Sequence, residues 1–234
     1  MKKRTIFFDL DDTLYERATP YRKAFSQFFG SRCAGKADAA FEAVRRRGDA
    51  VFRAAHTGQM PMEEMYIYRQ QTGLADVGIS VTAEQALELQ ALYAEQQRHI
   101  ALSDTMCAVL DFCRGAFSAT GIITNGGVET QGGKLESLGI ARWVRPELTI
   151  ISDAADVMKP DPAIFRLAEQ AAGCGPEDCI FVGDSPSQDM EPAAARGWTT
   201  VWVDRGREPI GAARPAYTVR SEQELLDCLR TLGG

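Results

Sequence analysis

The sequence is poor in the residues that build transition-metal sites. It has only two histidines, His56 and His99, and no two of its cysteines form a C-x-x-C pair. Zinc sites normally need several such residues at close spacing, so the sequence argues against a zinc site. We expect reduced, buried thiols at the six cysteines, which are Cys33, Cys107, Cys113, Cys174, Cys179 and Cys228.

Long hydrophobic runs and an excess of basic charge are also missing. No apolar stretch approaches the roughly 20 residues that span a bilayer. The apolar run Ile6–Phe8, after a basic start, is interrupted by Asp9 before a secretory signal could form. The net charge of −6 provides no basic footprint for nucleic acid. We therefore expect a cytoplasmic globular protein, a monomer or homodimer, without membrane or nucleic-acid partners.

Short apolar runs, each ending in a polar residue, are the main pattern present. Continuous rather than alternating apolar residues are typical of strands buried on both faces of a parallel sheet. Helical patterns separate the runs, with Asp104 predicted as the N-cap of one helix and Ser221 with Glu224 as the capping box of another. This alternation predicts an α/β core. The predicted strands are Thr5–Phe8, Gly121–Ile123, Leu148–Ile151, Cys179–Val182 and Thr200–Val203.

The segment between the first and second predicted strands has a different character. It contains no convincing strand, and it is too long for an ordinary connection. We predict an inserted all-helical domain at residues 15–101 and a discontinuous core at residues 1–14 and 102–234. The predicted helices of the insertion are Tyr21–Phe29, Ala39–Ala55, Met62–Gln71 and Ala83–His99.

Two carboxylates follow the first predicted strand directly, Asp9 and Asp11. Ligands of parallel sheets bind outside the carboxyl ends of the strands, so both side chains can face one pocket. One carboxylate can then act as a nucleophile while the other transfers protons. Taken alone, the pattern fits a strand followed by a capped turn equally well.

Three more polar clusters follow later strands. Thr124 and Asn125 precede two glycines and a helical stretch, where a hydroxyl and backbone N–H groups can hold a phosphate. Lys159 lies between a predicted strand and a helix, where a fixed ammonium could offset negative charge. Asp184 and Asp189 follow a buried strand and suit a hard cation. Each cluster also has a plain reading, as a turn, a surface lysine or a helix cap.

The order of these clusters resembles the haloacid dehalogenase superfamily. Its four motifs match the letters DLDDT, TN, KP and GDSPSQD as they stand in this sequence. The resemblance covers the core, from Lys3 to Leu14 and from Leu102 to Leu232. It implies a Rossmann-like parallel-sheet core, with the helical insertion as a mobile cap domain.

The resemblance also implies roles for individual residues. Asp9 would be the nucleophile and Asp11 the general acid/base. Thr124, Asn125 and Lys159 would bind the substrate phosphate. Mg²⁺ would be held by Asp9, the backbone carbonyl of Asp11 and Asp184, with Asp189 in support. Asp204 ends the last apolar run outside these motifs and is interpreted as a structural or rim residue.

The implied activity is a magnesium-dependent phosphatase acting on a small phosphomonoester through an aspartyl phosphate. A nucleoside monophosphate is the first choice of substrate, and phosphoglycolate or a sugar phosphate is the alternative. A phosphomutase, a 2-haloacid dehalogenase and a non-catalytic binding module are the remaining alternatives. Tyr15, Glu16, Arg17 and Tyr21 lie just past the nucleophile, where they could contact a leaving group or simply pack at a helix entry.

Overall fold

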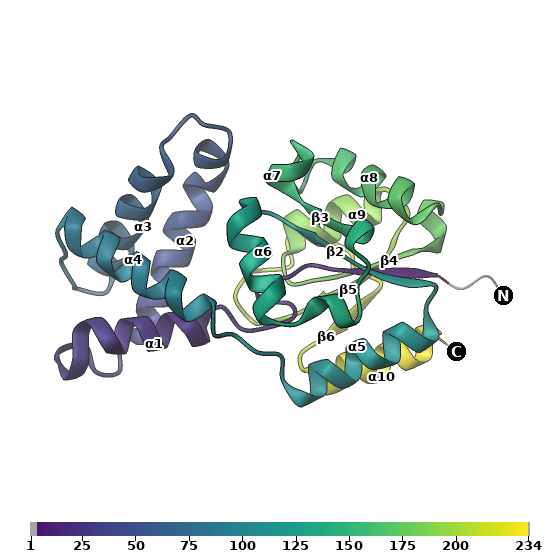
Figure 1. Cartoon of the computed structure of the whole chain (residues 1–234), viewed down its shortest axis with the longest axis horizontal. Coiled ribbons are helices and arrows are strands. Elements are labelled where there is room, and N and C mark those ends of the chain that lie inside the picture. Colours follow the sequence, from purple (N-terminus) through teal and green to yellow (C-terminus); the bar gives the residue numbers. More distant parts are fainter. Residues whose placement is uncertain (1–3, 234) are drawn as a thin grey trace. The chain divides into compact units, whose positions relative to one another are not determined.

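The computed structural model describes residues 4–233 and divides the chain into two compact units. Among these residues, one unit comprises those up to Glu16 and those from Ala101 onward, and the other is Arg17–Ile100. The first unit is an α/β fold and the second consists of helices (Figure 1). The two are described separately below.

The α/β unit is built on one sheet of six parallel strands in the order β3-β2-β1-β4-β5-β6. This confirms the predicted fold class. The five predicted strands are all present, whereas the sixth was missed because two of its three residues are exposed and it has no apolar run. The strands are β1 (Thr5–Phe8), β2 (Ala119–Thr124), β3 (Thr149–Ile151), β4 (Cys179–Gly183), β5 (Thr199–Val203) and β6 (Tyr217–Val219).

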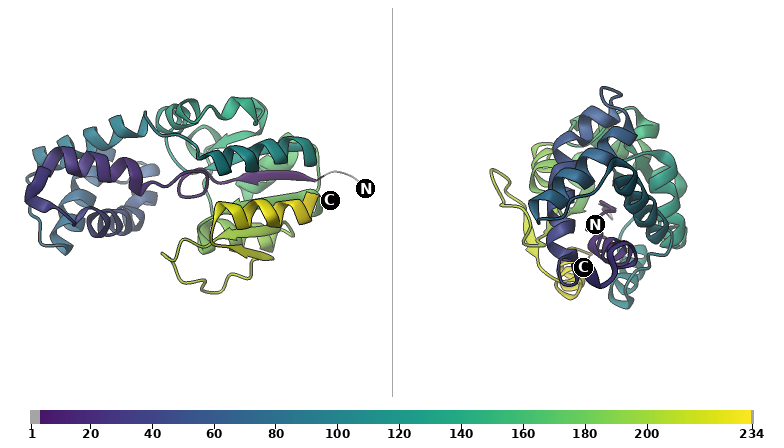
Figure 2. Two further views of the ribbon diagram at one scale, coloured as in Figure 1. Left: turned by 90° about the horizontal axis from the view of Figure 1, so that it is seen from below. Right: turned by 90° about the vertical axis from the view of Figure 1, so that its left-hand side faces the viewer.

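Helices cover both faces of this sheet. α5 and α10 lie side by side against one face, and α8 and α9 lie against the other (Figures 1 and 2). The predicted N-cap of α5 was wrong by one residue, because Ser103 rather than Asp104 accepts the hydrogen bond from the Met106 N–H. The helices are α5 (Asp104–Ala116), α6 (Val128–Ser137), α7 (Ser152–Ala155), α8 (Pro162–Ala172), α9 (Glu191–Ala195) and α10 (Glu222–Gly233), with short turns η2 (Ile140–Arg142), η3 (Pro146–Leu148), η4 (Pro176–Asp178) and η5 (Pro186–Met190).

Aromatic side chains fill the core between the sheet and α8. Phe165 of α8 contacts Phe181 of β4 edge to face, with ring centroids 5.4 Å apart, and Trp198 packs 5.3 Å from Phe7 of β1. All four side chains are buried. Each buries a large apolar area and their rings meet in favourable geometries, which stabilises the packing of α8 against the central strands.

The helical unit has its own core. It comprises α1 (Ala18–Phe29), η1 (Gly30–Cys33), α2 (Ala37–His56), α3 (Met62–Asp76) and α4 (Ala83–Gln97), which confirms the predicted helices within a few residues. Tyr21 is almost fully buried, packs against Phe41 and Tyr93, and donates a hydrogen bond to Gln70. Tyr21 is therefore a core residue of this unit, which favours the packing interpretation over a ligand contact.

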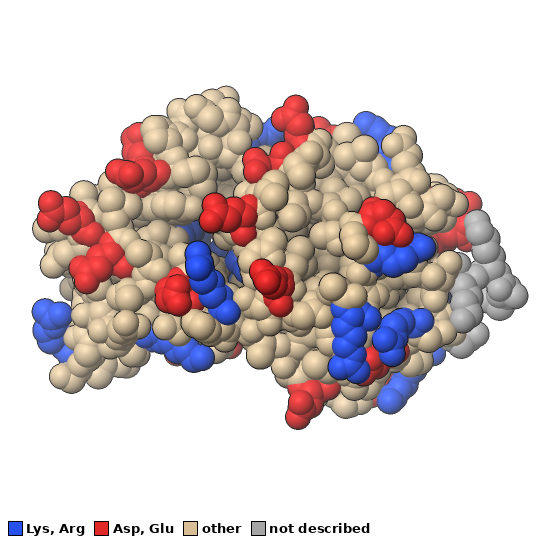
Figure 3. All heavy atoms as spheres, viewed as in Figure 1, with Lys and Arg blue, Asp and Glu red and all other residues tan. Residues whose placement is uncertain are grey.

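Charges of both signs are intermixed on the face shown in Figure 3. The described residues there form no continuous basic surface, in line with the net charge of −6. Within residues 4–233, no helix is both long enough and apolar enough to cross a membrane.

Candidate active site

Three predicted site residues lie at the carboxyl ends of three adjacent strands. β1 is hydrogen-bonded to β2 on one side and to β4 on the other, with Phe8 level with Ile122 and Val182. Thr124 therefore ends β2 one residue beyond the level of Asp9, and Asp184 follows β4 on the opposite side. The N–H of Asp9 continues the ladder to the Val182 carbonyl at 2.9 Å, which fixes the backbone of the proposed nucleophile.

Lys159 links two of the predicted carboxylates. Its ammonium lies 2.6 Å from Asp9 Oδ1 and 2.7 Å from Asp189 Oδ1, and all three side chains are buried. The pKa of Lys159 is raised above its usual range, because the two carboxylates outweigh the burial that would lower it. Lys159 is thus a permanent cation whose position is fixed from two sides. The chain around it follows the predicted pattern, with Asp161 capping α8, which begins at Pro162.

Asp9, Asp184 and Asp189 form an acidic cluster in which one carboxylate oxygen from each residue lies within 4.8 Å of the other two. Burial raises the pKa of Asp9 to about 7, with Lys159 opposing the shift and Asp189 adding to it. Burial and the charges of Asp9 and Asp189 also raise the pKa of Asp184 well above its usual value. The positive charge of one lysine therefore does not balance the negative charge of three carboxylates. Their oxygen atoms are suitable ligands for a hard divalent cation.

The three carboxylates differ in how they are already engaged. Both oxygens of Asp189 accept hydrogen bonds, one from Lys159 and the other from the Ser185 N–H at 3.1 Å. Among the described residues, none donates a hydrogen bond to the carboxylate of Asp184. Asp189 also packs against Gly183, where a side-chain Cβ would come within 2.4 Å of its Oδ2. Glycine at position 183 is therefore needed to admit Asp189 to the site.

The loop after β2 uses part of the predicted phosphate cradle for other purposes. The N–H of Gly126 donates to the Ser152 hydroxyl, and the N–H of Val128 donates to the Asp153 carboxylate. These backbone donors, expected from the glycine-rich start of α6, are therefore already occupied. Sequence reasoning missed this because Ser152 and Asp153 follow a different strand, β3.

The side chain of Asn125 is fully engaged in holding two loops together. Its Nδ2 donates to the Lys159 carbonyl and to Gln188 Oε1, both at 3.0 Å, and its Oδ1 accepts from the Lys159 N–H at 2.9 Å. These bonds fix the backbone of Lys159 and the turn η5. The geometry thus shows Asn125 positioning Lys159, while direct phosphate binding by Asn125 stays a prediction.

The loop after β1 carries site contacts that the sequence did not reveal. The Asp11 carboxylate accepts hydrogen bonds from the Tyr15 hydroxyl, from Gln131 and from Lys134. Asp12 has a positive φ of 62° and is paired with Arg207 at 2.6 Å. A non-glycine residue in this conformation costs energy, so the surrounding contacts must hold the loop in place. No sequence motif pointed to Gln131 or Lys134.

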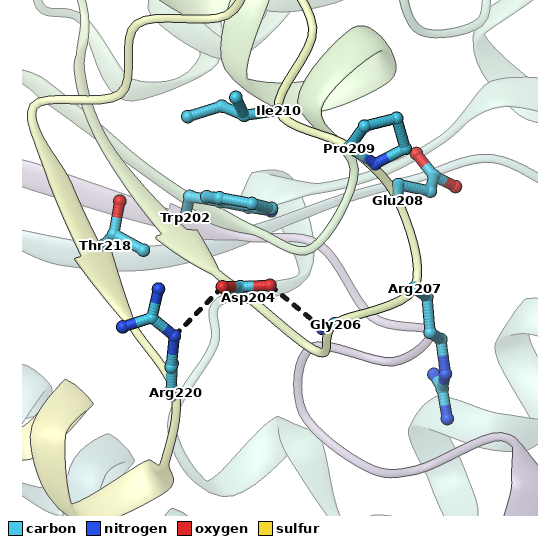
Figure 4. Close-up of a pocket in the computed structure, with 9 residues that line it drawn as sticks. All are labelled: Trp202, Asp204, Gly206, Arg207, Glu208, Pro209, Ile210, Thr218 and Arg220. Carbon is cyan, nitrogen blue, oxygen red and sulfur yellow. Dashed lines mark hydrogen bonds and ion pairs between the residues drawn. The ribbon is translucent and has the colours of Figure 1, made fainter.

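A pocket of about 580 Å³ opens beside the carboxyl ends of β5 and β6 (Figure 4). Asp204 at its wall accepts a hydrogen bond from the Gly206 N–H and pairs with Arg220 at 3.1 Å. These contacts stabilise the turn after β5, as expected of a structural residue. The pocket is lined by Trp202, Asp204, Gly206, Arg207, Glu208, Pro209, Ile210, Thr218 and Arg220.

This fold and this arrangement of carboxylates define a hydrolase with an α/β core. Residues 3–197 match the haloacid dehalogenase-like hydrolase family, and the chain belongs to that family. With a phosphoserine phosphatase from Thermus thermophilus the chain is 30% identical, over 88% of this chain and 90% of that protein. Together these similarities identify a phosphoric monoester hydrolase.

Solved structures confirm the fold. The HAD-hydrolase YfnB from Bacillus subtilis, described as bound to magnesium, is 21% identical with a TM-score of 0.73, covering 98% of this chain and 99% of that one. An L-2-haloacid dehalogenase from Xanthobacter autotrophicus is 18% identical with a TM-score of 0.72, covering 98% and 99%. At these identities the likeness establishes the fold alone.

Proposed function

We propose that this protein is a magnesium-dependent phosphatase that hydrolyses a small phosphomonoester through a phosphorylated Asp9. One observation carries the proposal: Asp9, Asp184 and Asp189 meet at the ends of adjacent strands, with Lys159 fixed between two of them. Phosphoryl transfer needs little from a protein beyond a positioned nucleophile and fixed positive charge. This cluster supplies both kinds of group.

Asp9 is the nucleophile of the proposed reaction. One of its oxygens is held by Lys159, and the other accepts a hydrogen bond from the Thr13 hydroxyl at 3.1 Å. Asp9 forms a bond to phosphorus as the bond between phosphorus and the ester oxygen breaks. Asp11, which is protonated for this step, gives that proton to the departing oxygen, and the resulting alcohol leaves.

The second step returns the enzyme to its starting state. Asp11 takes a proton from a water molecule whose oxygen forms a bond to phosphorus. The bond between phosphorus and Asp9 breaks, and inorganic phosphate is released. Lys159 keeps its positive charge beside the transferred group throughout, and the Thr124 hydroxyl donates a hydrogen bond to a phosphoryl oxygen.

Mg²⁺ would be held by Asp9, Asp184 and the backbone carbonyl of Asp11, with Asp189 in support. When bound, it supplies positive charge that stabilises the negative charge on the transferred phosphoryl group. Two observations support this assignment. None of the described residues donates a hydrogen bond to the Asp184 carboxylate, and the pKa values of Asp9 and Asp184 are raised. Asp189 supports it indirectly, since both of its oxygens are already engaged by Lys159 and Ser185.

The helical unit is proposed to act as a cap that encloses the leaving group. A separately folded unit inserted directly after the nucleophile loop can exclude water and select small substrates.

The alternative functions differ in what they require. A phosphomutase would retain the phosphoryl group on its substrate. A 2-haloacid dehalogenase would need neither Asp11 nor a metal, and a binding module would not need the complete set of groups.

Removing the metal should stop turnover. With Mg²⁺ the enzyme should hydrolyse an aryl phosphate, and excess chelator should reduce the rate to background because the acidic cluster then lacks its counter-charge. Asp184→Ala should raise the Mg²⁺ concentration for half-maximal rate by about tenfold or more, and Asp189→Ala by less. Magnesium titrations of the initial rate measure both effects. Full activity after exhaustive chelation would refute the metal assignment.

A panel of esters tests the substrate class. A nucleoside monophosphate is the first candidate, from the sequence, and phosphoserine is the second because the phosphoserine phosphatase matches this chain over most of its length. We expect at least one small ester to exceed every phosphopeptide in kcat/KM, because an enclosing cap obstructs a folded protein surface. Phosphoglycolate and hexose phosphates complete the panel. A phosphopeptide that ranks first would contradict the enclosure argument.

A further inference from the structure

Lys134 is a buried lysine that the proposed mechanism does not use. It lies on α6, is only 5% exposed, and donates to both carboxylate oxygens of Asp11, at 2.8 and 2.7 Å. Burying an ammonium group is costly unless a carboxylate pairs with it, so this contact cannot be treated as an incidental surface ion pair. The two residues are 123 positions apart in the sequence.

Gln131 lies three residues earlier, on the same face of α6, and is 1% exposed. Its Nε2 carries two hydrogens, which are shared among three acceptors: Thr124 Oγ1, the Asn125 carbonyl at 3.1 Å and Asp11 Oδ2 at 3.3 Å. A carbonyl and a carboxylate can only accept, so the nitrogen of the amide must face them. The backbone makes room for this side chain at Gly126, where φ is 148° and a Cβ would come within 2.8 Å of Gln131 Cγ.

The bond from Gln131 determines how the Thr124 hydroxyl can act. Thr124 Oγ1 accepts a hydrogen from Gln131, so its own hydrogen is left to be donated elsewhere. In the proposed reaction that hydrogen serves a phosphoryl oxygen. Without Gln131, the hydroxyl could rotate and donate to a neighbouring acceptor such as a carbonyl oxygen.

The carboxylate of Asp11 is held from two elements. Tyr15 donates to its Oδ1 from the same loop, while Lys134 and Gln131 reach it from α6. A group that gives a proton to one oxygen and later takes one from water must stay within hydrogen-bond reach of both positions. Hydrogen bonds from Lys134 and Gln131 on α6 can hold the Asp11 carboxylate in such a position more firmly than contacts within the loop after β1.

We propose that Lys134 and Gln131 are positioning residues of the reaction, Lys134 by fixing the carboxylate of Asp11 and Gln131 by orienting the hydroxyl of Thr124. This inference rests on the proposed phosphatase function. The competing explanation is purely structural, with both residues only attaching α6 to the sheet. For Lys134, the two explanations differ in how the loss of activity depends on the leaving group. For Gln131, they differ in how strongly a phosphate analogue inhibits the variant.

Lys134→Met separates these explanations through kcat/KM, which reports steps up to release of the leaving group. An alkyl ester needs a proton from Asp11 to leave, whereas p-nitrophenolate leaves without one. We expect Lys134→Met to lower kcat/KM for the alkyl ester about a hundredfold, and that for p-nitrophenyl phosphate less than about threefold. Equal losses on both esters would show a structural role and overturn the proposal.

A double substitution tests whether Lys134 acts through Asp11. If it does, adding Lys134→Met to Asp11→Asn should lower kcat/KM for the alkyl ester no further than Asp11→Asn alone. Independent, multiplying losses would contradict the proposal. Lys134→Gln provides a second, more polar replacement should the methionine variant fail to fold, and the same ratio between esters is expected of it.

Gln131→Met should give a different signature, because Thr124 contacts the phosphoryl group common to all substrates. We expect weaker inhibition by orthovanadate, by about tenfold, with the ratio between the two esters unchanged from wild type. Unchanged vanadate inhibition would overturn the role of Gln131. Glu136→Gln, an exposed charge on the same helix, is the matched control and should change neither quantity.

The outcome also separates this inference from the proposed function. A wild-type protein that turns over neither ester in Mg²⁺ would contradict both. An active wild type whose Lys134→Met variant loses activity equally on both esters, and whose Gln131→Met variant keeps wild-type inhibition by orthovanadate, would overturn the inference alone.

Discussion

Asp9→Asn should lower kcat for every phosphomonoester by roughly a thousandfold or more, because an amide cannot attack phosphorus. The substitution is nearly isosteric and keeps a hydrogen-bond acceptor for the Thr13 hydroxyl. It also removes one charge from a cluster in which burial and Asp189 already disfavour ionisation. We therefore expect the loss of activity without a loss of stability. Initial rates with p-nitrophenyl phosphate in saturating Mg²⁺ measure the effect.

Two controls make this result specific. Asp104→Asn carries the same chemical change at an exposed position on α5 and should leave the rate unchanged. Acid quenching during turnover should trap a hydroxylamine-labile phosphate on wild-type protein and none on Asp9→Asn. Activity of Asp9→Asn within about tenfold of wild type, or a label on another residue, would exclude Asp9 as the nucleophile.

Local sequence patterns predicted the frame of this site well, because they depend on neighbouring residues. Apolar runs ending in a polar residue located β1, β2 and β4, and the parallel-sheet rule brought their carboxyl ends together. The helical insertion was also recognisable, although the structural boundaries fall at Glu16 and Ala101 rather than at residues 14 and 102. A difference of this size is expected where a chain passes between units, since no turn signal marks the position.

The contacts that refine the site could not be predicted, because their partners are distant in the sequence. Lys134 looks like an ordinary surface lysine until the fold places it against Asp11, 123 residues away. Gln131 has no local signature either. Arg205, whose side chain donates to the Asp12 carbonyl at 2.9 Å, comes from a loop 193 residues further along. Such pairs depend on the sheet order, which only the three-dimensional structure provides.

The second large effect expected is on stability, which should fall as pH rises in metal-free protein. The pKa of Asp9 is about 7 in the folded state against 3.8 unfolded. Between these values the folded state binds more protons than the unfolded state, so the free energy of unfolding decreases with rising pH. The difference of about 3 pKa units corresponds to a loss on the order of 4 kcal/mol, complete by about pH 8. The raised pKa of Asp184 acts in the same direction.

Magnesium should reverse this loss, and more strongly at higher pH. A bound cation stabilises the ionised carboxylates, so its affinity and its contribution to stability grow as Asp9 and Asp184 lose their protons. In Mg²⁺ the free energy of unfolding should therefore change little between pH 5 and pH 8. Asp9→Asn lacks one of these titrations and should show a flatter pH dependence in chelator than wild type.

Tryptophan fluorescence can follow this effect in the α/β unit alone. All three tryptophans, Trp143, Trp198 and Trp202, belong to that unit, so unfolding of the helical unit does not contribute to the signal. Urea titrations at several pH values, in chelator and in Mg²⁺, give the free energy of unfolding under each condition.

The Asp9→Asn variant is the control. Other groups also titrate between pH 5 and pH 8, but their contributions are common to both proteins and cancel when the free energy of unfolding of Asp9→Asn is subtracted from that of wild type. A wild-type protein that is no more pH-sensitive than Asp9→Asn would show that Asp9 is ionised throughout this range. The cluster would then be compensated by Lys159 alone, and the physical argument for a cation at Asp9 and Asp184 would fail.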